Sequence, residues 1–521
     1  MQAGGVPGAE TTAAPAGRGL LRRVATISGW TLVSRVLGLI RDRLWAGALG
    51  GSPWLDAFLT AFQLPNLFRN LFGEGALTAA VLPRYVRLRE QDPAAAEAFL
   101  GLIIRRLALW LSALAGLGMA GAAAVLWWDP SWRITTVALL VVPMVPYLVF
   151  ICVAAVMGAA LQARGHFWIP AFSPVILNLL LISSVCLSAE AEARWLPWAV
   201  LLSGVLTVAL HLWGLRRHGG IPEPAPGGRT PAAAIGPQFA SAAFAAGVFQ
   251  IGAFIDTQIA YLCIAAPGAV AALYFANRLL QFPLAMIGHG TNTASFPELA
   301  RAAASGGWPA STAVLRDGAG FLAWWLIPAS LGLAACADPL VRTIYQTGAF
   351  TDEHVERTVL ATRLMALGLV PAALSKYLLR AFQAHEDLRT PLRLSLATVA
   401  LNVALSLLLV RWWAEAGIAA AGALTAAISC AAYLALLRRR SPTRILPWGA
   451  WRRPLLAGTA MTGAVLGLER LWPWHGGGGW LALAHLAAAV GLGAGLYMAL
   501  AGWRTGLRRP RAESAGSSDG A

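Results

Sequence analysis

The 521-residue chain has a mean hydropathy of +0.63, with 58% hydrophobic and only 12% charged residues. Soluble globular proteins are far less apolar, and apolar stretches of about 20 residues, long enough to cross a bilayer as a helix, recur from end to end. The composition excludes a soluble fold and predicts an all-α polytopic membrane protein.

The net charge of +16 comes from 40 Lys and Arg residues against 24 Asp and Glu residues. Basic residues on short cytoplasmic loops explain this excess better than nucleic-acid binding does. The five cysteines are dispersed in apolar stretches without a CxxC pair, and no HExxH, phosphate-binding loop or dinucleotide-binding motif occurs. We therefore expect neither an enzyme nor a bound cofactor.

The first 24 residues are polar and rich in Ala and Gly, and we expect them to form a disordered cytoplasmic tail. Fourteen membrane-spanning helices are predicted after it. Their approximate limits are 25–47, 56–82, 99–127, 134–162, 168–189, 195–216, 236–265, 269–297, 313–337, 358–384, 391–411, 417–437, 453–470 and 479–503. A second cytoplasmic tail (506–521) follows the last span.

The distribution of basic residues predicts the orientation. Loops after even-numbered spans, together with both tails, hold 27 Lys and Arg residues, whereas loops after odd-numbered spans hold nine. This bias predicts that both termini face the cytoplasm. The plasma membrane, the inner membrane of a bacterium, is the expected location.

Two pairs of short segments repeat at nearly equal offsets. GEGALTA (73–79) and GHGTNTA (288–294) are 215 residues apart, and QARGHFWIP (162–170) and QAHEDLRTP (383–391) are 221 apart. The repeats predict two parallel six-helix lobes around a central cavity, an arrangement in which transporters bind substrate between the halves. A duplicated structural scaffold is the alternative.

These repeats set the predicted domain limits. The N-lobe would comprise residues 25–217 and the C-lobe residues 235–440, joined by a Pro- and Gly-rich cytoplasmic linker at 218–234. Two further helices, within residues 441–505, would follow the second lobe.

The first span carries several charged side chains. At the bilayer centre, each would cost about 2.5–3.5 kcal/mol of free energy. Helical spacing places Arg35, Gly38 and Asp42 on one stripe, with Arg41 about 120° away and Arg43 at the interface. Asp42 could neutralise one of these arginines. The last three charges could instead simply end the helix.

The second span has a polar stripe with Arg69 beside it. The stripe residues, spaced by 7, 3, 4 and 4 positions, are Asp56, Gln63, Asn66, Asn70 and Glu74. Such a stripe must face protein or water rather than lipid. The eighth span has a counterpart in Asn277, Arg278 and Gln281.

The fixed charges within the spans are net positive. Cations at Arg35, Arg41, Arg69, Arg278 and Lys376 outnumber anions at Asp42, Asp56, Glu74 and Asp256. Guanidinium groups bind phosphate through two parallel hydrogen bonds. The residues thus predict an alternating-access transporter of an anionic, phosphorylated substrate.

Several stretches resemble the MurJ/MviN lipid II flippases of the multidrug/oligosaccharidyl-lipid/polysaccharide exporter superfamily. They are SRVLGLIRDR, DAFLTAFQLPNLFRNLFGEGALTAAVLP, IPAFSPVILN, YFANRLLQFP, YQTGAF and LRTPLRLS, within residues 25–440. The resemblance implies substrate-binding roles, which fall on Arg35, Arg41, Arg69, Arg278, Asp56 and Lys376, with Gln63 and Asn66 beside them. Gln63 stands where some members have Lys, and Asn277 and Gln281 where some have acidic residues.

The resemblance implies that the chain moves lipid II, the undecaprenyl-diphosphate-linked peptidoglycan precursor, to the outer leaflet by alternating access. Spans 13 and 14 would line a groove for the lipid tail, and the partners would be lipid II, membrane lipids and the peptidoglycan synthesis machinery. A sister exporter of another polyprenyl-diphosphate glycan, such as an O-antigen or capsule unit, and a non-transporting membrane scaffold are the alternatives.

Some family members resemble sodium-coupled carriers. The corresponding residues here would be Asp256, Asn402 and Thr425, with Ser406 where a stronger ligand is expected. Ordinary hydrogen bonds between helices are the alternative explanation for these polar groups.

Overall fold

The regular secondary structure that can be described is helical throughout. The computed structural model describes residues 16–69, 76–128, 131–187, 194–221, 236–441, 445–446, 448–473 and 480–502. Seven predicted spans coincide with single helices: α1 (Ala16–Leu49), α4 (Pro93–Trp128), α7 (Trp168–Cys186), α8 (Leu196–Arg217), α9 (Gly236–Cys263), α16 (Trp448–Leu471) and α17 (Trp480–Ala501). Helix α1 begins nine residues before the predicted span, so part of the tail expected to be disordered is helical.

The other spans are interrupted, or merge with their neighbours. The second span comprises α2 (Pro53–Phe68) and α3 (Ala76–Gln91), and the fourth comprises α5 (Trp132–Met144) and α6 (Tyr147–Ala163). Residues 70–75, between α2 and α3, lie outside the described residues. Pro143 and Pro146 explain the break between α5 and α6, because proline cannot donate to the helical ladder. The remaining elements are α10 (Ala269–Pro283), the π-helix η3 (Leu284–His289), α11 (Gly290–Ala335), α12 (Ala337–Tyr345), α13 (Asp352–Leu367), α14 (Leu369–Ala384) and α15 (Arg389–Arg440).

Seven described helical stretches are long and apolar enough to cross a membrane, or eight if the bent pair α13 and α14 forms one span. Two of these stretches run for 67 and 52 residues, whereas one crossing needs about 20. Non-helical backbone at Gly307 (φ 59°) and Ala414 (φ 45°) divides them. Each long stretch therefore contains more than one crossing, consistent with about fourteen spans.

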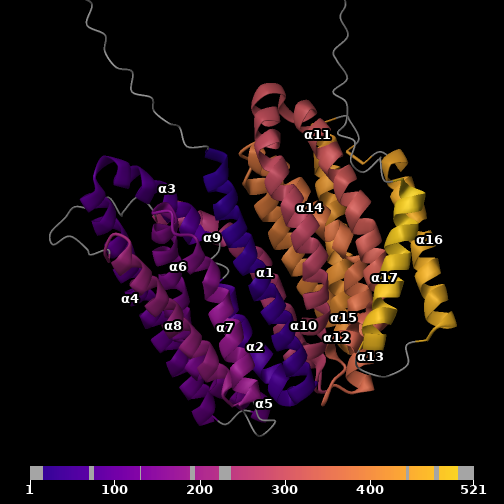
Figure 1. The fold of residues 1–521 in the computed structure, drawn as a ribbon, viewed down its shortest axis with the longest axis horizontal. Helices are drawn as coiled ribbons and strands as arrows, with labels where there is room; N and C mark the ends of the chain where they lie inside the picture. The colour runs from indigo at the N-terminus through magenta and orange to yellow at the C-terminus, as the bar shows by residue number, and fades with distance from the viewer. Residues whose placement is uncertain are drawn as a thin grey trace, which may run out of the picture.

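The helices form two groups that lie side by side in Figure 1, indigo to magenta and salmon to orange. In the first group α1 packs on α7 and α6 packs on α8; in the second, α11 packs on α14 and α15 packs on α9. Helices α16 and α17 pack on each other and on α11, at the edge of the second group.

The largest hydrophobic core joins the two groups at one end. It includes Trp45 and Phe58 from the N-lobe and Phe275 and Tyr345 from the C-lobe, all at most 2% exposed. In Figure 1 this end is the lower one, where α2, α10, α12 and α13 meet. Loops that follow odd-numbered spans lie here, and because the charge bias predicts that these loops face outward, we name it the outer end.

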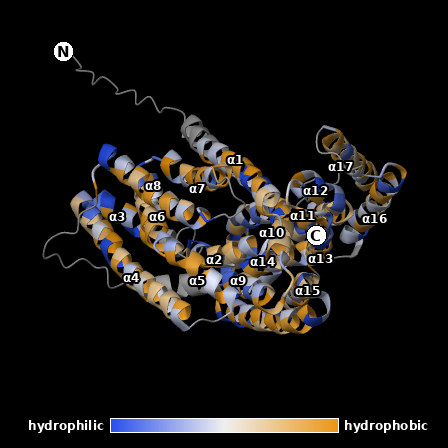
Figure 2. Ribbon diagram, turned by 90° about the horizontal axis from the view of Figure 1, so that it is seen from below, coloured by the Kyte–Doolittle hydropathy of each residue, from blue (hydrophilic) through white to orange (hydrophobic). Residues whose placement is uncertain are grey.

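Large apolar side chains remain exposed along the outward-facing helices. Trp110 and Leu117 on α4 are 77% and 71% exposed, and Trp480 on α17 is 75% exposed. Hydrophobic residues run along these same helices in Figure 2. Such a surface suits contact with lipid chains rather than water.

One of the two sequence repeats forms the same turn in both lobes. Gly165 (φ 86°) and Glu386 (φ 59°) each adopt left-handed backbone directly after a helix. In both turns the next residue's N–H closes back onto the helix, His166 to Leu161 O at 2.8 Å and Asp387 to Phe382 O at 2.9 Å. The shared turn is a Schellman-type helix end, which favours glycine. Residues 73–75 of the first segment of the other repeat lie outside the described residues.

Candidate substrate site

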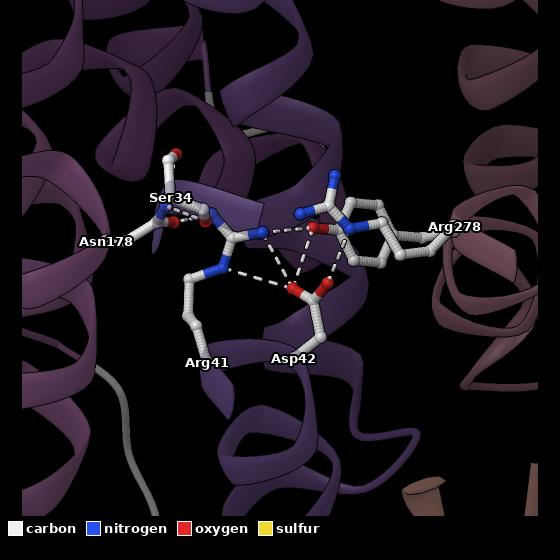
Figure 3. A network of polar contacts seen from close by, with 6 residues as sticks. Ser34, Arg41, Asp42, Asn178 and Arg278 are labelled. Carbon is white, nitrogen blue, oxygen red and sulfur yellow. Dashed lines mark hydrogen bonds and ion pairs between the residues drawn. The ribbon is translucent and has the colours of Figure 1, made fainter. Parts of the chain in front are cut away.

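A network of polar side chains around Asp42 joins α1 to α7 and α10. The Asp42 side chain is fully buried, and its Oδ1 accepts hydrogen bonds from Arg41 Nη2 (2.7 Å) and from the Tyr274 hydroxyl (3.1 Å). Arg278 Nε lies 2.9 Å from Asp42 Oδ2 as an ion pair between the lobes. Arg41 Nη1 also donates to Asn178 Oδ1 at 2.9 Å, as Figure 3 shows.

The Asp42 network neutralises charge that would otherwise be costly at membrane depth. A buried carboxylate is tolerated when it is paired and hydrogen-bonded, and here two guanidinium groups and a hydroxyl surround it. Gly38 is part of this arrangement, because a Cβ there would collide with the Arg278 guanidinium. The sequence indicated that Asp42 could neutralise an arginine. It did not show that one of the two arginines, Arg278, comes from the other lobe.

Arg43, which the sequence predicts to lie at the interface, is exposed and contacts α12. Its Nη1 donates to the backbone carbonyls of Thr343 (2.6 Å) and Ile344 (3.0 Å), in the last turn of α12. A cation at the carboxyl end of a helix satisfies carbonyls that have no intrahelical partner. Arg43 therefore fastens α1 to α12 at the outer end.

Asp56 is 2% exposed and caps a helix of the other lobe. Its Oδ2 accepts the Gly268 N–H at 2.7 Å and its Oδ1 accepts the Ala271 N–H at 2.8 Å, both in the first turn of α10. The charges of Arg357 and Arg133 also act on it. In this arrangement both carboxylate oxygens are engaged by the C-lobe, so the residue predicted to bind substrate serves here as a contact between lobes.

The rest of the polar stripe on α2 is half-buried. Gln63 Nε2 lies 3.3 Å from the Thr257 hydroxyl of α9, and Asn66 Oδ1 accepts two hydrogen bonds from Arg69, from Nη2 at 2.9 Å and Nε at 3.1 Å. Gln63 thus faces the other lobe. Asn70 and Glu74 lie outside the described residues.

The two other predicted cations are farther from the outer end. Arg35 on α1 is exposed, and Lys376 on α14 is half-buried. Both act electrostatically on His289 at the end of η3. Sequence reasoning overlooked His289, although the repeated segment GHGTNTA contains it.

The proposed sodium ligands are only partly grouped. Asn402 Nδ2 lies 2.8 Å from both Asp256 oxygens, and Ser406 donates to Asp256 Oδ1 at 2.9 Å. The Thr425 hydroxyl is buried without a hydrogen-bond partner among the described residues. The described residues contain no cluster of three His, Cys, Asp or Glu side chains able to hold a metal.

A family model described as lipid II flippase MurJ matches residues 45–484, which include most of the sites above. The chain belongs to the lipid II flippase MurJ family. Its relatives include a probable lipid II flippase MurJ of Rhizobium tropici, 32% identical over 87% of this chain and 88% of that protein. A lipid II flippase MurJ of Burkholderia cenocepacia is 30% identical over 87% and 90% of the two chains.

Solved structures show the same fold. A lipid II flippase MurJ in an inward closed conformation superposes with a TM-score of 0.77 at 21% identity, covering 92% of this chain and 99% of that one. An inward-facing MATE family transporter gives 0.65 at 13% identity, over 80% and 98%. Membership of the MurJ family confirms the predicted family and the predicted class, a multi-pass helical transporter rather than an enzyme.

Proposed function

We propose that this protein translocates lipid II from the inner to the outer leaflet of the bacterial plasma membrane by alternating access, for peptidoglycan synthesis. The single observation that carries the proposal is the match of residues 45–484 to the lipid II flippase family model, a range that includes Arg69 and Arg278. Both termini would lie in the cytoplasm, and the membrane would be the inner membrane of a bacterium.

Arg35, Arg41, Arg69 and Arg278 would hold the diphosphate, with Lys376, Gln63 and Asn66 beside the headgroup. Guanidinium groups suit this task because they offer two parallel donors to phosphate oxygens. Arg41 and Arg278 now pair with Asp42, so a bound diphosphate would compete with this carboxylate for them. Such competition would couple substrate binding to the contact between lobes.

Closure at the outer end supports alternating access. Besides Asp56 and the Asp42 network, Arg133 Nη2 donates to Ile264 O at 2.9 Å and the Ala349 N–H to Gly47 O at 2.8 Å. The bonds of Asp56, the Arg278–Asp42 ion pair and these two bonds link the two lobes at the end where odd-numbered loops lie. They would have to break for the headgroup to leave outward, while the lipid tail stays in the bilayer near α16 and α17.

We further propose that Asp256, Asn402, Ser406 and Thr425 hold a sodium ion that couples to transport. A hard cation prefers oxygen ligands, and these side chains offer a carboxylate, an amide oxygen and two hydroxyls. Asn402 and Ser406 already contact the Asp256 carboxylate, which supports the fit for these three residues. The Asn402 amide would need to turn its oxygen toward the ion.

Depletion of the protein from growing cells tests the substrate. We expect lysis and accumulation of lipid II, because peptidoglycan synthesis would lose its precursor on the outer side. If the cells instead stay intact and lose one surface polysaccharide, the substrate is another polyprenyl-diphosphate glycan. If neither lipid II nor another polyprenyl-diphosphate glycan accumulates, the protein acts as a membrane scaffold and not as a transporter.

A further inference from the structure

Exposed tryptophans collect at the outer end of the molecule. Among the described residues, nine tryptophans that are at least 42% exposed lie in or beside the turns that follow spans 3, 5, 11 and 13. Tryptophan has an apolar ring and one N–H donor, and it is enriched where a bilayer meets water. We call these residues the outer tryptophan band: Trp127, Trp128, Trp132, Trp195, Trp198, Trp412, Trp413, Trp472 and Trp480.

The turns at the seam between the lobes lack exposed tryptophans. Trp45, near the end of α1, is fully buried, and Trp54, at the start of α2, is half-buried. The turns at 264–268, before α10, and at 346–351, before α13, contain no tryptophan. The outer tryptophan band therefore follows the rim of both lobes and of α16 and α17, and it leaves out the region where the lobes meet.

Four of the peripheral spans also carry an exposed arginine toward the inner end. The resulting pairs are Arg106 and Trp127 of α4, Trp195 and Arg216 of α8, Arg393 and Trp412 of α15, and Arg453 and Trp472 of α16. Their members are 21, 21, 19 and 19 residues apart. At a helical rise of about 1.5 Å per residue, these separations span about 28–32 Å, and the hydrocarbon core of a bilayer is about 30 Å thick. We call the four arginines the inner arginine band.

The surface between the two bands is apolar. No charged residue occurs between Arg106 and Trp127 in the sequence, and the large exposed side chains there are Leu109, Trp110, Leu114, Leu117 and Met119. Helix α4 lies at one edge of the molecule and α16 at the opposite edge in Figure 1, so the pattern occurs on both sides. A docking site for one partner protein would occupy one face, whereas a bilayer contacts the whole rim.

We propose that the two bands are the sites at which the peripheral helices bind the lipid interfaces of the bilayer. The rings of the outer tryptophan band lie at the boundary between acyl chains and headgroups, with their N–H groups toward water. The guanidinium groups of the inner arginine band extend to lipid phosphates on the other side. The peripheral helices are thereby held at a fixed depth, and movement between the lobes takes place at the seam, which lacks the tryptophans.

Labelling of single cysteines in the purified full chain, reconstituted in lipid nanodiscs, tests this placement. The background is C186S/C263S, which removes the two exposed cysteines. A charged, water-soluble maleimide should label R106C and W127C about tenfold faster than L117C, because such a reagent does not enter hydrocarbon. L117C is the matched control, since Leu117 is 71% exposed and lies between the bands on the same helix. All three variants should label equally after unfolding in SDS.

Fluorescence quenching by brominated lipids locates the tryptophans themselves. The emission that W127F/W128F removes should be quenched about twofold more strongly by bromines near the headgroups than by bromines near the chain ends. W412F/W413F should give the same result, because these residues belong to the same band in the other lobe.

Three results would overturn the proposal. Equal labelling of R106C and L117C in nanodiscs would place the exposed face of α4 in water. Emission of Trp127 and Trp128 that no brominated lipid quenches would also place these rings in water, as a docking site for another protein requires. Stronger quenching by the deep bromines would place the band inside the hydrocarbon. None of these results bears on lipid II translocation, so the proposed function would stand in each case.

Discussion

Arg278 on α10 and Asp42 on α1 form an ion pair of 2.9 Å between the two lobes, beside the contact of Arg278 with Gly38. The pair closes the seam between α1 and α10. In the proposed function, a diphosphate would compete with Asp42 for Arg278, so binding of the anion would be linked to opening of the seam.

Arg278→Ala should abolish most lipid II transport, with a fall of at least tenfold in flipping rate. It would remove a proposed phosphate ligand, and it leaves Asp42 with Arg41 and the Tyr274 hydroxyl as its partners. Asp42→Asn combined with Arg278→Ala should recover thermal stability without recovering transport. Recovery of both would assign Arg278 a structural role only.

Asp56→Ala should favour the outward-open state. Loss of a helix cap costs about 1–2 kcal/mol, and here the cap belongs to the closed outer end. A cysteine in place of the fully buried Ala46 should react several-fold faster with an impermeant thiol reagent in this background.

Asp92→Ala is the matched control for Asp56→Ala. Asp92 caps α4 by accepting the Ala94 and Ala95 N–H groups at 3.0 and 3.1 Å, entirely within the N-lobe. Its loss should lower stability by a similar amount and leave the cysteine at position 46 unreactive. Equal labelling in both backgrounds would exclude a gating role for Asp56.

Glu386→Gly should raise the free energy of unfolding by about 1 kcal/mol. A non-glycine residue in left-handed backbone costs about 1–2 kcal/mol, part of which the backbone entropy of glycine offsets. Gly165→Ala is the reciprocal change in the N-lobe, and nothing lies within 4 Å of the added Cβ. It should destabilise by about 1 kcal/mol through φ alone. The stability of both variants is measured by thermal unfolding in detergent. If Glu386→Gly lowers the stability, the backbone at Glu386 is not strained.

The loop residue His166 predicts a dependence of stability on pH. Partial burial, the stacked ring of His218 (3.5 Å) and the charge of Arg164 lower the pKa of His166 below 6.5. The unfolded chain then binds this proton more readily, so the stabilisation is present above pH 6.5 and is lost as pH falls through the lower folded pKa. His166→Phe keeps the ring and should flatten this part of the melting-temperature profile. An unchanged profile would show that other groups dominate.

Sodium should stabilise the protein if it binds near Asp256. A ligand that binds only the folded state raises stability as its concentration exceeds its dissociation constant. The melting temperature should therefore be higher in NaCl than in KCl of equal strength, and Asp256→Asn should remove the difference. Equal melting temperatures would leave hydrogen bonds between α9 and α15 as the role of these residues.

The sequence allowed the helical architecture to be predicted because span length and charge bias are local properties. The predicted spans match most of the helices closely. They differ where prolines interrupt a span, and where two spans form one continuous element with a single non-helical residue inside it, as at Gly307. The shared turn at Gly165 and Glu386 reflects the repeat that was visible in the sequence.

The partners of the charged groups were harder to predict. The bonds of Asp56 reach Gly268 and Ala271, 212 and 215 residues away, and they use backbone N–H groups that leave no mark in the sequence. Asp42 could be paired with a neighbouring arginine from spacing alone, but its pairing with Arg278 depends on how the lobes meet. His289 was recognisable only as a polar residue in an apolar span.

The most direct test is the leaflet distribution of lipid II in cells depleted of this protein, read with an external enzyme that cleaves only outward-facing lipid II. Transport through the Arg278 site predicts that cleavable lipid II falls on depletion, returns with the wild-type protein and does not return with Arg278→Ala at equal expression. An outward fraction that stays unchanged on depletion would contradict lipid II transport by this protein. Full recovery with Arg278→Ala would contradict the assigned site.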